Sequence, residues 1–291
     1  MSEPCPRRFS RSPDSVEVAF AGIRADRRRG AHALAEAAIG TLGRLLDRWS
    51  DAKERPTRRA VRRVARVLET AQPAMGPFLR WAAEWRRMER GVSSEAFLRT
   101  ARAWAQEESA RLRSEEGGIA RTARKSYPRS ARHIVTISRS RSVLRALATL
   151  TSAQRPEKIS VLESLPGGEG RRFSRELRQA GLSARTVPDS AASKVVGAAD
   201  LLMIGADAVF ADGSVAHKVG TKALAKAAFR HGIPVVVVAG RSKFTERPAP
   251  RGRLPPLFDR TPSRYITEFW TDEGVRPAGG THPRASGPVP L

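Results

Sequence analysis

The chain has 291 residues, with 53 Lys and Arg against 29 Asp and Glu, and its formal net charge is +24. With 40% hydrophobic and 28% charged residues the composition is globular, and the longest apolar run, residues 233–239, is far too short to cross a bilayer. Cys5 is the only cysteine and precedes the predicted folded part, which excludes an intramolecular disulfide, a cysteine-rich zinc site and a cysteine nucleophile there.

The basic residues are mostly arginine and are spread over the whole chain, so there is no basic tail. The positive electrostatic field of such a chain attracts polyanions and favours a phosphate-bearing ligand without identifying one. No apolar segment follows the basic residues near the N-terminus, and the sequence therefore predicts a cytoplasmic protein that is neither secreted nor bound to a membrane. No metal-ligand spacing occurs, and we predict neither a metal site nor a cofactor.

Residues 16–125 have the apolar spacing of helices joined by short turns. Between residues 23 and 46, apolar side chains recur at intervals of three and four, which is typical of helices with one buried face. Prolines and a glycine interrupt the pattern at positions 56, 73, 77 and 91. Ser93 precedes a further helix, which we expect to end near Gly117 and Gly118.

One predicted helix carries a basic face. Five arginines lie within an arc of about 140° at 100° per residue, and these are Arg58, Arg59, Arg62, Arg63 and Arg66. Such a face could lie against a nucleic-acid backbone, but an amphipathic helix with a solvated basic face has the same pattern. We favour the solvated face and keep RNA or an acidic partner as the alternative.

After residue 130 short β-rich runs alternate with helical ones. The predicted strands are residues 133–137, 159–162, 184–187, 201–204 and 234–239, and the predicted helices are 142–150, 174–180, 191–198 and 221–231. This alternation predicts an α/β protein in which a helical N-terminal domain precedes a Rossmann-like, doubly wound parallel sheet domain. The expected divisions are a disordered leader (1–15), the helical domain (16–128), the ligand-binding domain (129–278) and a disordered tail (279–291).

Ligands of doubly wound sheets bind beyond the carboxyl ends of the strands, so the segments that follow the strands are the candidate site. After the first strand, residues 136–142 present hydroxyl and guanidinium groups at a helix start, which suits an anion, although Ser140 or Ser142 could simply cap that helix. After the second, residues 163–172 carry three glycines and two arginines, a pattern that an ordinary turn explains nearly as well.

The segment after the fourth strand is the most informative. Asp207 directly follows an apolar run, Asp212 and Gly213 indicate a tight turn, and Lys218 precedes a glycine and a helix start. A carboxylate and an ammonium presented together suit proton transfer on a phosphorylated substrate, whereas a structural Asp–Lys pair is the competing interpretation. The charged residues of segment 240–244, after the fifth strand, could close a pocket or remain in water.

Residues 202–244 resemble the signature of the family that joins the alpha, beta and delta subunits of eukaryotic initiation factor 2B to methylthioribose-1-phosphate isomerase and ribose-1,5-bisphosphate isomerase. The resemblance rests on segments 205–207, 212–215 and 218–221. It extends to Arg29-Gly30-Ala31, to segment 163–170 and to segment 258–275. It implies a helical domain, a Rossmann-like domain and a homodimer formed through the latter.

The resemblance also implies roles for individual residues. Asp207 matches the catalytic aspartate of the isomerases, whereas Ser138 stands where they have a catalytic cysteine, and a hydroxyl is a much weaker acid than a thiol. His217 replaces the usual asparagine and Leu165 the usual arginine. The candidate site residues are Asp207 and Ser138 as catalytic groups, and Arg29, Gly30, Arg139, Arg141, Glu163, Arg171, Arg172, His217, Lys218 and Gly220 as ligand or phosphate contacts.

Three functions follow from these residues. The first, which we favour, is a non-catalytic or regulatory homologue that binds a phosphorylated sugar or nucleotide at the carboxyl edge of the sheet, because Ser138 replaces the cysteine. The second is an aldose–ketose isomerase of a phosphorylated pentose, which the retained Asp207 and Lys218 favour. The third is a translation-factor-like interaction module that contacts RNA or an acidic partner through the arginine face.

Overall fold

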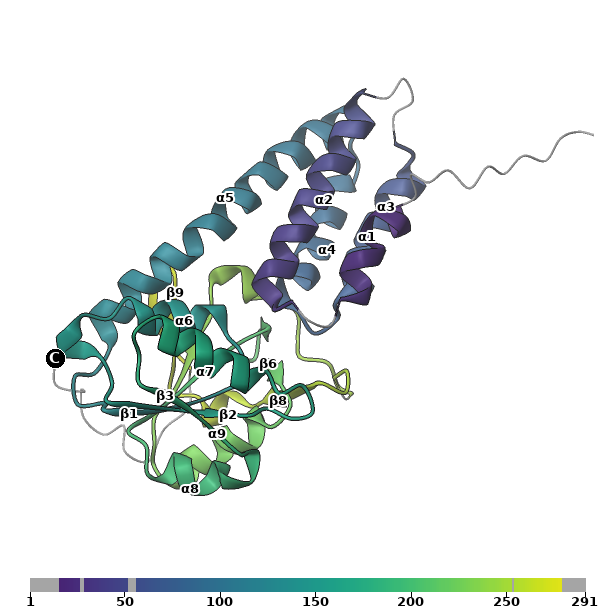
Figure 1. The fold of residues 1–291 in the computed structure, drawn as a ribbon. Helices are drawn as coiled ribbons and strands as arrows, with labels where there is room; N and C mark the ends of the chain where they lie inside the picture. Colours follow the sequence, from purple (N-terminus) through teal and green to yellow (C-terminus); the bar gives the residue numbers. More distant parts are fainter. Residues whose placement is uncertain (1–15, 27–28, 52–55, 253, 279–291) are drawn as a thin grey trace, which may run out of the picture.

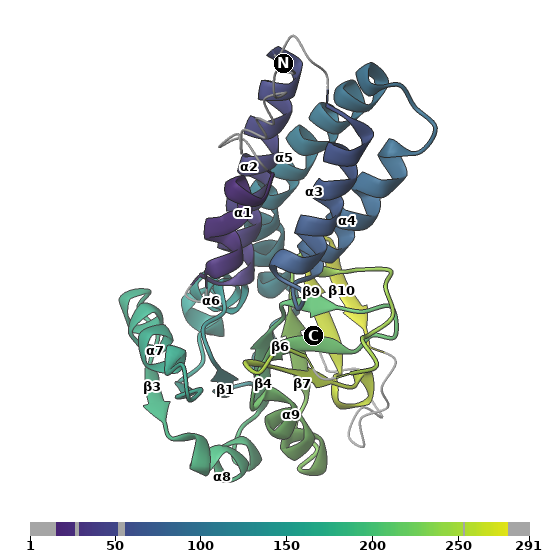
Figure 2. The ribbon, with the colours of Figure 1, turned by 90° about the vertical axis from the view of Figure 1, so that its right-hand side faces the viewer.

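A computed structural model describes residues 16–26, 29–51, 56–252 and 254–278. The predicted leader and tail lie outside these residues. Before the first strand the chain forms five α-helices within the described ranges: α1 (Val16–Ala25), α2 (Ala31–Asp51), α3 (Arg58–Ala71), α4 (Gly76–Glu89) and α5 (Ser94–Ser126). They form an elongated bundle that stands on one end of the sheet region (Figures 1 and 2).

Local sequence accounts for where two of these helices begin. The Thr57 and Ser93 hydroxyls accept hydrogen bonds from Ala60 N and Ala96 N, each at 3.2 Å, and so cap α3 and α5. The apolar face of each helix lies in one core around Trp81. All five arginines of the predicted basic face of α3 are exposed.

Two of those arginines are paired within the bundle. Arg62 Nε donates to Glu89 Oε1 at 3.0 Å, and Arg63 pairs with Glu17. An exposed face that is partly neutralised by glutamates of the neighbouring helices α1 and α4 is typical of a solvated amphipathic helix.

The helix α5 is longer than the sequence predicts, because it passes through Gly117 and Gly118 and ends at Ser126. A Cβ at Gly118 would overlap the backbone of Asp272, so the glycine permits a close approach between α5 and the sheet region rather than ending the helix. The Thr122 hydroxyl donates to Thr271 O at 2.7 Å. The last turns of α5 therefore belong to the core of the sheet region, and the predicted division at residue 128 falls in the turn that follows α5.

The main sheet has the order β10-β9-β7-β4-β1-β2-β3, with β10 antiparallel to β9 and the other pairs parallel. Its strands are β1 (His133–Ile137), β2 (Lys158–Leu162), β3 (Ala184–Val187), β4 (Leu201–Gly205), β7 (Val235–Val238), β9 (Glu268–Thr271) and β10 (Gly274–Pro277). The predicted α/β fold with a helical N-terminal region is confirmed. Because the chain builds outward from β1 in both directions, the crevice between the ends of β1 and β4 is the topological switch point.

Helices cover both faces of the main sheet (Figure 1). They are α6 (Arg141–Ala148) and α7 (Glu169–Gln179) on one face, and α8 (Ala192–Gly197) and α9 (Thr221–Arg230) on the other. Among the described residues, the structure contains no helix with the length and hydropathy that a membrane span requires.

The sequence prediction missed the short strands. These are β9 and β10, which extend the main sheet, and β5 (Ala208–Val209), β6 (Val215–Lys218) and β8 (Phe258–Thr261), which form a separate antiparallel sheet. The helix predicted at 174–180 begins five residues earlier, at Glu169. Gly168 precedes it in the left-handed conformation, with φ +65°.

Candidate ligand-binding site

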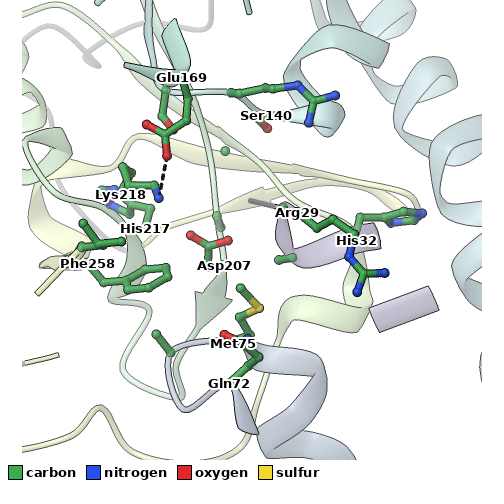
Figure 3. Close-up of a pocket in the computed structure, with 18 of the residues that line it drawn as sticks. Arg29, His32, Gln72, Met75, Ser140, Glu169, Asp207, His217, Lys218 and Phe258 are labelled. Carbon is green, nitrogen blue, oxygen red and sulfur yellow. Dashed lines mark ion pairs between the residues drawn. The ribbon is translucent and has the colours of Figure 1, made fainter. Parts of the chain in front are cut away.

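The switch point of the sheet opens into a cavity of about 760 Å³ that the helical region covers. Its walls come from the ends of β1 and β4, from β6, from the start of α2 and from the turn between α3 and α4. Figure 3 shows Asp207 near its centre, with Arg29 and His32 on one side and Lys218 and Phe258 on the other. Further lining residues are Gly30, Gln72, Met75, Ser138, Arg139, Ser140, Arg141, Glu169, Glu176, His217, Thr221 and Lys243.

Asp207 is held in the cavity by its backbone. Its N–H donates to Ala216 O at 2.8 Å, and its carbonyl accepts from Gly76 N, the first residue of α4, at 2.8 Å. Burial raises the pKa of the Asp207 carboxyl, while Lys243 and Lys218 oppose that rise. A carboxyl group with a raised pKa that faces a cavity can exchange a proton with a bound molecule.

Ser138 lies at the end of β1, in a backbone conformation that side chains rarely adopt. Its φ is +61°, in the left-handed region, where a residue with a Cβ is strained. Two residues later the Ser140 hydroxyl accepts from Val143 N at 3.3 Å and caps α6. A Cβ at Gly205 would overlap the Ser140 side chain, so the glycine lets the turn after β1 lie against the end of β4. Ser140 thus has the capping role that the sequence left open.

The Lys218 ammonium forms an ion pair with Glu169 Oε1 at 2.8 Å and lies 5.5 Å from the centre of the Phe258 ring (Figure 3). Both Lys218 and Glu169 are partly exposed to the cavity. The lysine is therefore available at the cavity wall, but it shares its charge with a carboxylate at the start of α7.

His217, the residue before Lys218, is buried and neutral. Burial lowers the pKa of its imidazole to about 3. Neither ring nitrogen forms a hydrogen bond with the described residues, and Nδ1 lies 3.7 Å from Asp259 Oδ1. Because a buried nitrogen without a hydrogen bond costs free energy, the imidazole is suited to receive one from a bound molecule.

The start of α2 forms the opposite wall. Gly30 O accepts the first helical bond, from Leu34 N at 3.1 Å, so the N–H groups of the first turn have no acceptor within the helix. The Arg29 side chain is 44% exposed and pairs with Asp26 at 2.7 Å. A long helix that presents free N–H groups beside an arginine is a favourable place for a phosphate.

Two further arginines of the predicted site lie at the cavity wall and are paired. Arg139 Nε donates to Glu176 Oε2 at 2.8 Å. Arg141 contacts Glu36 at 3.3 Å and pairs with Glu116. These ion pairs connect the turn after β1 with α7 and with the helical region.

The structure brings eight of the predicted site residues to the cavity and leaves four outside its lining. The eight are Ser138, Arg139, Arg141, Asp207, His217, Lys218, Arg29 and Gly30. Outside it, Glu163 and Arg171 pair at 2.9 Å, and Arg172 pairs with Glu176 at 3.1 Å. Gly220, with φ +96°, precedes α9, and its N–H donates to Asp259 Oδ2 at 2.8 Å.

Sequence reasoning missed other lining residues, above all Lys243 and His32. Lys243 follows β7, and the rule that ligands bind beyond strand ends points to its segment, but it does not predict that the side chain is buried. His32 and Gln72 come from helices far away in sequence, and no local signal identifies them as cavity residues.

Fold and geometry together define a doubly wound α/β protein with a charged cavity at the switch point, covered by a helical region. Residues 27–253 match the sequence model of the initiation factor 2 subunit family. The chain belongs to that family, which confirms the resemblance found in the sequence.

Curated relatives of this chain include isomerases. It is 32% identical over 163 residues to 5-deoxyribose 1-phosphate isomerase of Moorella thermoacetica, an alignment that covers 46% of each chain. It is 31% identical over 142 residues to ribose 1,5-bisphosphate isomerase of Haloferax volcanii, covering 40% of this chain and 44% of the relative. The chain thus spans less than half the length of these curated relatives.

Solved structures share the fold over most of the chain. The translation initiation factor eIF-2B of Pyrococcus horikoshii OT3 superposes with a TM-score of 0.71 at 23% identity, covering 91% of this chain and 96% of the other. The 5-methylthioribose 1-phosphate isomerase of the same organism gives a TM-score of 0.63 at 22% identity, covering 90% and 84%. At this identity the likeness establishes the fold alone.

Proposed function

We propose that the cavity binds a small phosphorylated sugar or nucleotide and that the protein is a non-catalytic or regulatory member of its family. The observation that carries the proposal is that the free N-terminus of α2, beside Arg29, and the Asp207 carboxyl line the same cavity. The first suits a phosphate, and the second suits the hydroxyl groups of a sugar.

Ser138 is the reason for proposing binding without turnover. An isomerase must move a proton between two carbon atoms, and a group that gives and takes that proton works best with a pKa near the ambient pH. A serine hydroxyl is a far weaker acid than a cysteine thiol. The cavity therefore keeps the groups that hold a ligand and lacks the thiol.

Relatives support the ligand class and the assembly. The isomerases among them are named for pentose 1-phosphates or a ribose bisphosphate, so we propose a phosphorylated pentose as the first ligand to test. The name of one solved neighbour is that of a tetrameric eIF2B-beta2-delta2 complex, and we propose a homodimer through the sheet region for this chain. We also propose that the protein acts in the cytoplasm.

One observation favours catalysis as the second candidate. The Asp207 carboxyl, whose pKa burial raises, faces the cavity together with Ser138, whose backbone is strained. Both features are typical of reactive sites. An aldose–ketose isomerase would use Asp207 to move the proton and Lys218 to polarise an oxygen.

Phosphorus NMR with ribose 1,5-bisphosphate separates the two candidates. We expect the wild type to broaden the phosphorus lines without converting the sugar. Ser138→Cys restores the thiol, and we expect it to gain conversion that is absent from Ser138→Cys/Asp207→Asn. Ser193→Cys adds an exposed thiol on α8 and serves as the matched control.

Each outcome decides between the proposals. Conversion by the wild type that Asp207→Asn abolishes establishes the isomerase and rejects the non-catalytic function. Phosphorus lines that stay sharp up to millimolar protein reject the binding function itself.

A further inference from the structure

Residues 117–156 contain nine arginines and lysines and no acidic residue. They cover the last turns of α5, the turn after it, β1, α6 and the loop before β2. Glutamates from outside the segment pair with three of the nine, which are Arg132, Arg139 and Arg141. Arg155 donates to Gly181 O at 2.9 Å. The other five are exposed, and we call them the α5–α6 basic surface: Arg121, Arg124, Lys125, Arg129 and Arg145.

The helices α5 and α6 lie side by side beneath this surface (Figure 1). Two contacts fix how they are aligned: Arg141 pairs with Glu116, and Arg124 Nε donates to Thr149 O at 2.7 Å. Between these contacts, from residue 116 to 124 on α5 and from 141 to 149 on α6, each helix advances about 12 Å. Arg121 and Arg145 lie within that distance, so the two helices contribute to one continuous basic surface.

The fold does not balance the charge of this surface. Within the part of the chain that the structure describes, none of its five residues forms an ion pair. The helix dipole favours the basic residues in the last turns of α5 and α6, but it does not account for Arg121 or Arg129. Arg121 is also one turn from Lys125, and like charges at this spacing destabilise a helix. Such a surface is suited to a partner that supplies negative charge.

The surroundings of the surface indicate the chemistry of that partner. The exposed large apolar side chains of the described residues all lie outside this segment, whereas binding to a membrane surface needs apolar side chains beside the charges. Tyr127, the only aromatic residue of the segment, is buried and donates its hydroxyl to Ala131 O at 2.7 Å. No ring of the segment is therefore available to stack on a base. Arginine binds phosphate with paired N–H groups, so the surface suits a nucleic-acid backbone.

Exposed hydroxyl groups beside the surface favour RNA over DNA. Ser130 follows Arg129, and Thr151 and Ser152 begin the segment after α6. Gln154 Nε2 donates to Arg124 O at 2.8 Å, which holds that segment against the end of α5. Proteins recognise double-stranded RNA through its phosphates and 2′-hydroxyl groups, largely without contacts to base edges, and a serine or threonine hydroxyl can bond to a 2′-hydroxyl.

We propose that the α5–α6 basic surface binds the backbone of double-stranded RNA without contacting its bases. None of the five residues lines the cavity, so this function is additional to the proposed one and does not depend on it. The arginine face of α3 is not the RNA contact in this proposal, because glutamates of α1 and α4 pair with two of its arginines.

Arg121→Gln/Arg145→Gln tests the proposal by removing two charges from the surface. The probe is a fluorescent RNA duplex of about 16 base pairs, and its binding is measured by anisotropy at several salt concentrations. At about 100 mM salt we expect the dissociation constant to rise about 10-fold, and the slope of log affinity against log salt to fall by about two.

Arg58→Gln/Arg59→Gln is the matched control, because it removes the same charge from two exposed arginines of α3. It should bind the duplex within about two-fold of the wild type, with an unchanged salt slope. Arg121→Lys/Arg145→Lys keeps the charge and should also keep the slope, which separates lost charge from altered folding. Ribose 1,5-bisphosphate should bind Arg121→Gln/Arg145→Gln as it binds the wild type, so the two proposals fail independently.

Four results overturn the proposal. If both double glutamine variants weaken binding equally, the net charge of the chain and not this surface binds the RNA. A wild type that does not bind the duplex at micromolar concentration rejects the function. Equal affinity for a DNA duplex of the same sequence rejects RNA as the specific partner, and tighter binding of single-stranded RNA rejects the duplex.

Discussion

A buried acidic side chain has several hydrogen-bond partners in one region of the molecule and no ion pair in another. In the helical region, Glu108 is 2% exposed and accepts hydrogen bonds from Trp81 Nε1 at 2.8 Å, from Arg80 Nη1 at 3.2 Å and from Arg111. These partners hold the pKa of its carboxyl below the usual value although burial raises it. At the edge of the sheet, Asp207 has no ion pair with the described residues, and burial leaves its pKa raised.

The difference distinguishes a structural charge from one that is available to a ligand. A buried carboxylate that is fully hydrogen-bonded stabilises the protein because losing it would leave its partners unpaired. One that faces a cavity without a partner lowers stability and makes its proton available. The same contrast separates Lys218, paired with Glu169, from Lys243, which has no such partner.

The largest effect is expected in the helical region. Glu108→Gln removes the charge that Arg80 and Arg111 share, and the largely buried Arg80 then keeps Glu84, at 2.9 Å, as its remaining carboxylate partner. We expect the free energy of unfolding to fall by about 3 kcal/mol, as when one partner of a buried pair is removed. Urea denaturation at pH 7 measures this. A loss below about 1 kcal/mol would mean that Glu108 is not the structural charge described above.

A smaller effect is expected from His217. Its folded pKa of about 3 lies below the value of 6.5 for an exposed histidine, so between these values the unfolded chain binds more protons and acidification destabilises the protein. We expect the free energy of unfolding to fall between pH 7 and pH 4.5 by about 2 kcal/mol less in His217→Asn than in the wild type. Chemical denaturation at both pH values gives the difference.

Titration of Asp259 changes the stability in the opposite direction over part of that pH range. Burial raises the pKa of its carboxyl to about 6, so its contribution to stability is lost as the pH rises from about 4 to 6. The test therefore compares the pH dependence of stability in His217→Asn with that of the wild type, and does not require the stability of the variant to be independent of pH. Identical losses in the two proteins would show that the imidazole is protonated in the folded state.

The smallest effect on stability is expected at Asp207. Because burial disfavours its ionised form, Asp207→Asn should leave the free energy of unfolding at pH 7 unchanged or raise it by up to about 1 kcal/mol. The gain should shrink as the pH falls, because the raised pKa lets the folded Asp207 carboxyl take up a proton before the unfolded one does. If Asp207→Asn lowered the free energy of unfolding by more than about 1 kcal/mol at pH 7, Asp207 would be a structural charge like Glu108.

The sequence predicts well which residues lie at the carboxyl edge of the sheet. The rule that ligands bind beyond the strand ends needs only the position of each strand, and strands can be predicted from local sequence. Ser138 directly follows β1, Asp207 lies two residues after β4, and the two strands are neighbours, so both residues reach the cavity. The rule does not give the direction of a side chain. Arg171, expected at the site, turns instead to Glu163, which lies at the end of the adjacent β2.

The cover of the cavity could not be predicted from the sequence. It depends on contacts between residues far apart in the chain, such as Gly76 with Asp207 and Glu115 with Ser242. The five strands missed have only two to four residues each, and their pairing, not their composition, makes them strands. Lys243 illustrates the limit, because the sequence leaves open whether its segment closes a pocket or remains in water until the helices that bury it are known.

A crystal structure of the protein with ribose 1,5-bisphosphate tests the central claim most directly. The account predicts one phosphate within about 3 Å of the first N–H groups of α2, beside Arg29, with the sugar hydroxyls against the Asp207 carboxyl. A phosphate bound away from the start of α2, or a cavity that stays empty while the ligand lies elsewhere on the protein, would contradict it.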